Sequence, residues 1–121
     1  SSTFILADVN KLYRLLNLEK SKVKISDLDE TCDINYLKVI VLSPMKRRII
    51  TTKAGESVNL SEILVGDESS DVVIKAWRNY SKLFENVNVG DMLELHKFQF
   101  LSDDYGNCLN VKSYSSITNL K

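Results

Sequence analysis

One short stretch of strict alternation predicts a β-strand in the middle of the chain. Every second residue from Val72 to Ala76 is small or branched and apolar, and Val73, Lys75 and Trp77 take the other positions. Successive side chains of a strand point to opposite faces of its sheet, so each set shares one face. We therefore predict that the Val72 set faces the core and that Trp77 lies on the other face.

An apolar stretch directly before this strand predicts the other half of a hairpin. It runs from Val58 to Val65 and stops at Gly66-Asp67, and several polar residues separate it from the alternating strand. Two such runs joined by a polar, glycine-containing turn are typical of a β-hairpin. We expect two antiparallel neighbours connected by an acidic turn.

Further strands are predicted on both sides of this hairpin. Residues 36–43 are almost continuously apolar and β-branched, and residues 49–52 are strand-like again after a basic turn. On the other side, residues 91–101 and 108–114 read as a second hairpin around a polar turn. Between the two hairpins, apolar residues recur at helical spacing within residues 78–86, which predicts a short helix.

The order of these elements predicts the fold class. Three strands, a short helix and two more strands follow one another, as in an OB fold, where the helix closes one end of the barrel between the third and fourth strands. We predict an all-β chain with a flanking helix. Its core would be a five-stranded Greek-key OB-fold barrel with a short helix between strands 3 and 4, preceded by an N-terminal helix.

The N-terminal helix is predicted at residues 8–20, because Asp8 is a suitable N-cap and the apolar residues that follow form one stripe. We assign residues 1–24 to a helical extension and residues 25–121 to the OB-fold domain. The stripe must be covered, either by the chain's own barrel or by another subunit, and the sequence does not choose between them. Leu12, Tyr13 and Leu16 are the candidate partner-binding residues.

Charge and composition limit the functional classes. Lys+Arg and Asp+Glu both number 16, so the formal net charge is zero and no overall field attracts polyanions. A nucleic-acid site would therefore need a local basic patch. No apolar stretch approaches the roughly 20 residues that span a bilayer, so we expect no membrane partner.

Catalysis has little support in the sequence. His96 is the only histidine and has no neighbouring nucleophile, and Cys32 and Cys108 match no metal-ligand spacing. No glycine-rich phosphate loop is present. We expect a binding protein that is not an enzyme, with no metal, no cofactor and no small-molecule substrate.

Several short motifs resemble the single-stranded-DNA-binding OB domains of the replication protein A large subunit and its relatives. They span residues 25–120 and comprise Ile25-Ser26-Asp27-Leu28, Val65-Gly66-Asp67-Glu68-Ser69, Val72 to Trp77, Phe84, Val89-Gly90-Asp91 and Leu109-Asn110-Val111. The first OB domain of shieldin complex subunit 2 is similar in Val41-Leu42-Ser43-Pro44, Asp67-Glu68-Ser69, Trp77-Arg78, Gly90-Asp91 and Ser113-Tyr114-Ser115-Ser116-Ile117.

The resemblance implies single-stranded DNA as the partner. In the family, aromatic residues on the third strand and near the fifth stack on bases. Trp77 matches the third-strand position, but the fifth-strand position falls on Cys108, so Tyr105 or Tyr114 would have to supply the second aromatic face. The resemblance therefore implies weak binding by this domain alone, together with other subunits of a nuclear complex for DNA replication, repair, recombination or telomere maintenance.

Cations and polar groups complete the predicted interface. The loop between the first two strands would hold phosphates through Lys46, Arg47, Arg48 and Lys53. The face around Trp77 would include Lys75, Tyr105, Asn110 and Lys112. The alternatives are a solvated basic turn and a tryptophan that only packs at the barrel mouth.

A second function stays open from the sequence. The neutral net charge, the cysteine at an expected aromatic position and the acidic Asp103-Asp104 turn favour an OB fold that acts as a protein-interaction scaffold. Such a domain would receive a polypeptide on the same face or through the N-terminal helix.

Overall fold

The alternation around Trp77 forms strand β4 (Asp71–Trp77), as predicted. Its Val72 set is buried, and Val73, Lys75 and Trp77 are half-buried. The preceding β3 (Ser57–Gly66) pairs with it antiparallel, so the predicted hairpin is present. The computed structural model describes residues 23–120. The predicted N-terminal helix, with Leu12, Tyr13 and Leu16, lies outside the described residues.

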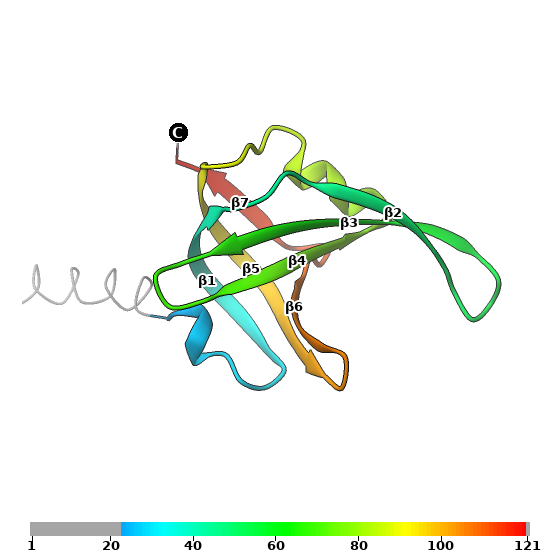
Figure 1. Ribbon diagram of the computed structural model, residues 1–121, viewed down its shortest axis with the longest axis horizontal. Coiled ribbons are helices and arrows are strands. Elements are labelled where there is room, and N and C mark those ends of the chain that lie inside the picture. The colour runs from blue at the N-terminus through cyan, green and yellow to red at the C-terminus, as the bar shows by residue number, and fades with distance from the viewer. Residues whose placement is uncertain (1–22, 121) are drawn as a thin grey trace, which may run out of the picture.

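Five strands close into a ring in the order β1-β3-β4-β6-β5, because β5 also pairs with β1 (Figure 1). The remaining members are β1 (Cys32–Val41), β5 (Met92–Asp103) and β6 (Gly106–Asn110). Neighbours are antiparallel except β4 and β6, which run parallel. The 3-10 helix η2 (Arg78–Phe84) lies between β4 and β5, as the predicted fold class requires.

The core lies inside the ring. Its largest fully buried side chains include Leu37 of β1 and Phe98 and Phe100 of β5. On β5 the buried positions change parity, from Leu93 and Leu95 to the two phenylalanines. Lys97 lies between them with φ 61, a left-handed conformation that is uncommon for lysine. This local turn lets one long strand bury side chains in both halves of the ring.

The basic segment predicted as a turn is instead strand β2 (Lys46–Thr51). It pairs along its whole length with β3, from Lys46 opposite Glu62 to Thr51 opposite Ser57. The sequence prediction was wrong here because a run of basic residues usually lies in a solvated turn. This run instead lies on a strand, which can hold many charged residues because it is exposed and pairs with β3 alone. Figure 1 shows the β2–β3 hairpin projecting from the ring.

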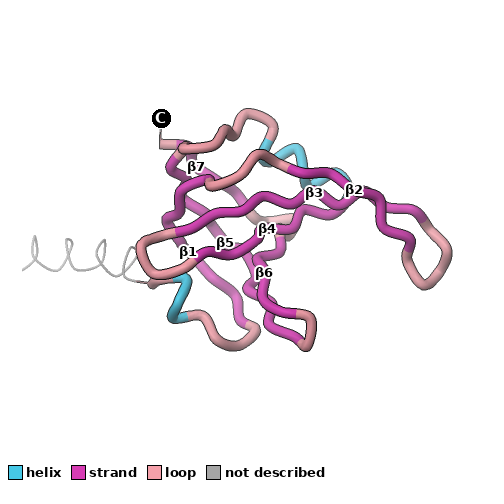
Figure 2. Tube along the Cα trace, viewed as in Figure 1, coloured by secondary structure: helices cyan, strands magenta, loops and turns pink. Residues whose placement is uncertain are grey.

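Two strand limits also differ from the prediction. β1 begins at Cys32, earlier than the predicted residue 36, and β6 ends at Asn110 rather than continuing to residue 114. The chain then turns where the backbone N–H of Ser115 donates to the carbonyl of Lys112, at 3.0 Å. A short strand that was not predicted, β7 (Ser116–Asn119), follows and pairs with β5 (Figure 2).

The lead-in to the ring is fixed by an acidic turn. Ile25 begins the 3-10 helix η1 (Ile25–Asp27) and is buried, and Leu28 packs against the core. The N–H of Ile25 donates to Asp67 Oδ2 at 2.9 Å. Asp67 Oδ1 accepts from the N–H groups of Ser69 and Ser70, at 2.7 and 3.2 Å. One carboxylate thus closes the β3–β4 turn and holds the first described residues against it.

Candidate nucleic-acid interface

Trp77 lies on the outer face of the ring, the face that does not form the core. Strand register places it opposite Leu60 of β3, and Leu60 lies opposite Arg48 of β2. Leu60 is only 1% exposed although it shares this outer face, whereas Trp77 is half-buried. The tryptophan therefore neighbours a buried leucine on one side and lines an open groove on the other.

Charged side chains form a row across the same face. Lys46 of β2 lies opposite Glu62 of β3, which in turn lies opposite Lys75 of β4. The Arg48 Nε atom is 2.8 Å from Glu62 Oε1. One carboxylate thus lies among three cations, and this part of the face carries a net positive charge although the whole chain is neutral.

Apolar side chains form the next row. Val73 lies opposite Leu64 on β3 and beside Cys108 on β6, and Cys108 lies opposite Leu101 on β5. Cys108 is 7% exposed. Burial raises the pKa of its thiol, and the nearby Lys75 charge opposes that rise only in part. The side chain is therefore a neutral thiol at physiological pH and offers a small apolar surface in place of an aromatic ring.

A groove of about 270 Å³ connects these rows. Its lining includes Trp77, Lys75, Cys108, Asn110 and Tyr105. The structure thus brings together four residues that the sequence predicted for one interface, namely the tryptophan, the lysine, the asparagine and the tyrosine.

Tyr105 lies on the β5–β6 turn at the rim of this groove and is 99% exposed. Asp103 fixes the turn, since its Oδ1 accepts from the Tyr105 N–H at 2.8 Å. The Asp103 carboxylate, which also lines the groove, thus holds the turn that carries Tyr105. A second aromatic face accompanies Trp77, although it comes from the turn rather than from the strand position of Cys108.

Asn110 lines the groove beside Lys75. Its side-chain oxygen is buried and has no hydrogen-bond partner among the described residues. Buried polar atoms normally have a partner, and an unmet one adds a free-energy cost of about 1–3 kcal/mol. A bound molecule with a hydrogen-bond donor would relieve this cost, provided that the amide turns toward the groove.

Arg78 follows Trp77 and ties the projecting hairpin to β4. Its guanidinium makes two hydrogen bonds to Glu56, Nη2 to Oε1 at 2.9 Å and Nη1 to Oε2 at 3.3 Å. The hydrogen bonds from Arg78 lower the pKa of the Glu56 carboxyl. Arg78 has φ 56, an uncommon conformation for arginine, and the backbone leaves β4 there to begin η2.

The other predicted residues are less closely grouped. Arg47 alternates with Lys46 and Arg48 along β2, so it points to the opposite face of the hairpin. Lys53 lies in the turn at the far end of the hairpin, and Lys112 lies just beyond β6. Neither lysine lines the groove.

The sequence prediction missed Glu62 and Arg78. Alternation along β3 would have placed Glu62 on the outer face, but only the pairing register shows that it lies between two basic neighbours. The bidentate contact of Arg78 depends on Glu56, which is 22 residues away in sequence. No local pattern encodes either arrangement.

The histidine lies on another face. His96 is on β5, opposite Tyr36 of β1, with the two ring centroids 5.6 Å apart, and its Nε2 is 3.3 Å from Thr118 Oγ1. Within residues 23–120, no three histidine, cysteine or acidic side chains come together in a way that could hold a metal ion. No helix in that range is long and apolar enough to cross a membrane.

Comparison with known proteins gives structural neighbours but no sequence relatives. No protein-family model matches the chain, and no curated protein matches its sequence. A replication factor A related protein from Methanobacterium thermoautotrophicum is similar with a TM-score of 0.67 and 19% identity, over 82% of this chain and 90% of that one. The second OB-fold domain of replication protein A from Methanococcus maripaludis is similar with a TM-score of 0.63 and 17% identity, over 82% and 94%.

A third neighbour is a chain of a replication protein A heterotrimer bound to single-stranded DNA. Its TM-score is 0.63 at 19% identity, and the match covers 80% of this chain and 24% of that one. The likeness in all three cases is one of fold. The chain has an OB fold that is similar to those of replication protein A, as the sequence resemblance predicts.

Proposed function

We propose that this OB fold binds single-stranded DNA on the outer face around Trp77. The observation that carries the proposal is the groove that Trp77, Tyr105, Lys75 and Asn110 line together. Single-strand binding needs aromatic faces for bases and cations for phosphates. The fold neighbour in a heterotrimer bound to single-stranded DNA supports the same reading.

The bases would contact the apolar side of the groove. Trp77 would stack on one base and Tyr105 on a second, while Cys108 leaves room between them. Asn110 would offer its amide to a base edge. Stacking tolerates any base because every base has a π face, so we expect little sequence preference.

The phosphates would follow the charged row. Lys75 and Lys46 are the candidate contacts, and Arg48 would join them if it left Glu62. With so few cations, and one carboxylate among them, we expect weak binding by the isolated domain.

We further propose that the domain works beside other subunits of a nuclear complex for DNA replication, repair, recombination or telomere maintenance, as a binding module that is not an enzyme.

Salt dependence tests the phosphate path. For single strands, the slope of log K against log salt falls in magnitude by about 0.7 for each lost phosphate contact. Lys46→Ala should lower the slope by about this amount when a labelled oligonucleotide is titrated at several salt concentrations. Arg47→Ala is the matched control, since it removes the same charge from the next residue on the opposite face. Equal slopes for the two variants would contradict the proposed path.

Glu62→Gln should strengthen binding. The change removes the only carboxylate of the charged row and releases Arg48, whose Nε lies 2.8 Å from Glu62 Oε1. Exposed charge pairs are worth roughly 0.2–1 kcal/mol, so we expect an increase in affinity of about 1.5- to 5-fold at low salt. The same oligonucleotide titration measures it. Unchanged or weaker binding would show that the phosphates do not follow the charged row.

A polypeptide ligand is the second candidate for the same groove. Glu62 among the cations and the neutral Cys108 in an aromatic position favour it. Hydrogen exchange separates the two functions: single-stranded DNA should protect the backbone amides of β4 and β6. Protection there by a partner protein, with no change on adding DNA, would support the scaffold function instead.

A further inference from the structure

An exposed apolar surface lies on the ring face that carries His96, away from the groove. Ile40 lies opposite Met92, and the N–H of Leu120 donates to the Met92 carbonyl at 2.8 Å, so these three residues form one row. Leu42 and Val89 lie close by, since the N–H of Gly90 donates to the carbonyl of Val41 at 2.9 Å. We call Ile40, Leu42, Val89, Met92 and Leu120 the apolar patch.

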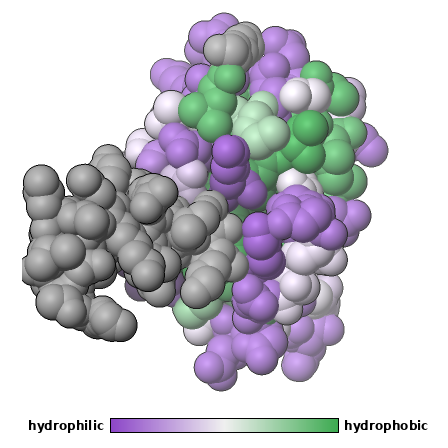
Figure 3. All heavy atoms as spheres, turned by 90° about the vertical axis from the view of Figure 1, so that its left-hand side faces the viewer, coloured by the Kyte–Doolittle hydropathy of each residue, from purple (hydrophilic) through white to green (hydrophobic). Residues whose placement is uncertain are grey.

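The patch is open to solvent. Leu42, Val89, Met92 and Leu120 are all exposed large hydrophobic residues. Figure 3 shows hydrophobic surface gathered in the upper part of this side of the molecule. Scattered exposed apolar residues need no explanation, but a contiguous group on one face marks a surface that another segment or molecule covers.

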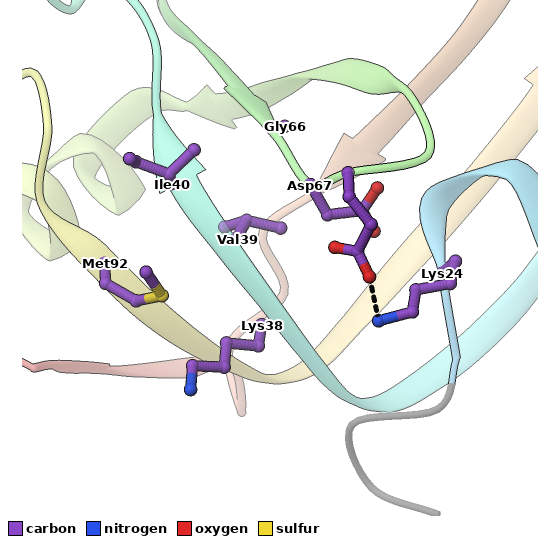
Figure 4. Close-up of a pocket in the computed structure, with 8 residues that line it drawn as sticks. Lys24, Lys38, Val39, Ile40, Gly66, Asp67 and Met92 are labelled. Carbon is purple, nitrogen blue, oxygen red and sulfur yellow. Dashed lines mark ion pairs between the residues drawn. The ribbon is translucent and has the colours of Figure 1, made fainter.

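A hollow of about 410 Å³ continues the patch. Val39, Ile40 and Met92 contribute apolar lining, and Asp67 lies on its other side (Figure 4). The charged side chains of Lys24, Lys38 and Glu68 also line the hollow. Because Ile40 and Met92 belong to both, the hollow and the patch form one continuous surface.

The chain arrives at the edge of this hollow. Lys24 lines it and forms an ion pair with Glu68, and the N–H of Ser26 donates to Ser69 Oγ at 3.0 Å. Residues 24–26 are thus fixed against the β3–β4 turn. Leu18 is six residues before Lys24, and an extended chain spans at most about 3.3–3.6 Å per residue. Leu18, the last residue of the stripe, can therefore lie at most about 20–22 Å from Lys24, which lines the hollow.

We propose that the N-terminal segment of this chain covers the apolar patch of the same molecule, with its apolar stripe from Val9 to Leu18 seated on Met92 and Ile40. The stripe and the patch each expose apolar side chains that need a cover. Because residues 24–26 are fixed at the edge of the hollow, the stripe that precedes them is held near the patch. A helix of this length is marginal alone in water, so its apolar face must gain stability by packing. A helix over residues 8–20 would be about 20 Å long at 1.5 Å per residue, enough to cross a three-stranded face.

The two methionines provide the test. Met92 lies in the patch, and Met45 packs against the core elsewhere and serves as an internal reference. In the full chain, labelled at both methionine methyl groups, a soluble paramagnetic agent should broaden Met92 only slightly. Leu12→Asp with Leu16→Asp should raise the broadening of Met92 several-fold and shift its resonance, while Met45 stays unchanged.

A matched pair of substitutions controls for charge. Asn10→Asp with Asn17→Asp adds the same two charges off the stripe and should leave Met92 as in the parent chain. Equal exposure of Met92 in the parent and the stripe variant would overturn the proposal. Sedimentation equilibrium completes the test: a monomer of 13.8 kDa with a covered Met92 supports packing within one molecule, whereas a dimer that the stripe substitutions dissociate would overturn it.

Discussion

Replacing Trp77 with alanine should weaken the binding of single-stranded DNA by about 5- to 150-fold. Stacking of a base on an aromatic side chain is worth about 1–3 kcal/mol, and each 1.4 kcal/mol is a factor of ten in affinity. Trp77 lines the groove beside Tyr105, so its loss leaves one aromatic face of two. Fluorescence anisotropy of a labelled oligonucleotide at low salt measures the change.

Two further variants separate stacking from packing. Trp77 lies opposite the buried Leu60, so its truncation also affects stability, and thermal unfolding of the variant must be followed in parallel. Trp77→Tyr keeps an aromatic face and should recover most of the affinity. Tyr114→Ala removes an exposed aromatic residue that does not line the groove and should leave binding unchanged. Parent-like affinity for a folded Trp77→Ala protein would exclude this face as the DNA site.

Replacing Asp67 with alanine should lower the free energy of unfolding by about 1.5–3 kcal/mol. Its carboxylate accepts from the backbone N–H groups of Ile25, Ser69 and Ser70, and hydrogen bonds to charged groups contribute about this much. The substitution releases both the β3–β4 turn and the lead-in. We expect a melting temperature lower by on the order of 10 °C. Asp71→Ala removes an exposed carboxylate beside the same turn and should change stability little.

The contribution of Asp67 should depend on pH. Burial alone would raise the pKa of its carboxyl, but the Ser69 hydroxyl and the backbone N–H groups of Ile25, Ser69 and Ser70 outweigh burial and lower it. A lowered pKa in the folded state adds stability that is complete above the unfolded value of about 3.9 and is lost as the pH falls below it. The stability difference between the parent and Asp67→Asn should therefore narrow in acid. A constant difference down to pH 2 would contradict this.

Sequence reasoning located the ring strands where the signal is local. The alternation in β4 and the glycine-acidic turn before it each depend on neighbouring residues, and both are present as predicted. The sequence prediction failed at β2. This strand pairs with β3 alone and is exposed, so it tolerates charged residues and lacks the alternation of apolar and polar residues that identifies a strand. The prediction also missed β7, which has only four residues, Ser116–Asn119, and shows no hydrophobic run.

In the candidate site, too, some residues could be predicted from a local sequence pattern and others could not. Trp77, Lys75, Asn110 and Tyr105 were predicted from strand parity and from the resemblance, and they line one groove. The neighbours of Glu62 depend on the register of three strands, and the contact between Arg78 and Glu56 depends on where the hairpin ends. These features arise from pairing between distant segments, so a local pattern does not contain them.

The free edge of β2 gives its basic residues a second role. Among the described strands β2 pairs with β3 alone, which leaves unpaired backbone N–H and C=O groups along its outer side. Such an edge is a template on which a strand of another molecule can pair. Lys46, Arg47 and Arg48 place like charges there, so two copies approaching edge to edge repel each other. We therefore expect Arg47, although remote from the groove, to oppose edge-to-edge pairing. Neutralising all three residues should lower both the proposed DNA affinity and the resistance to aggregation.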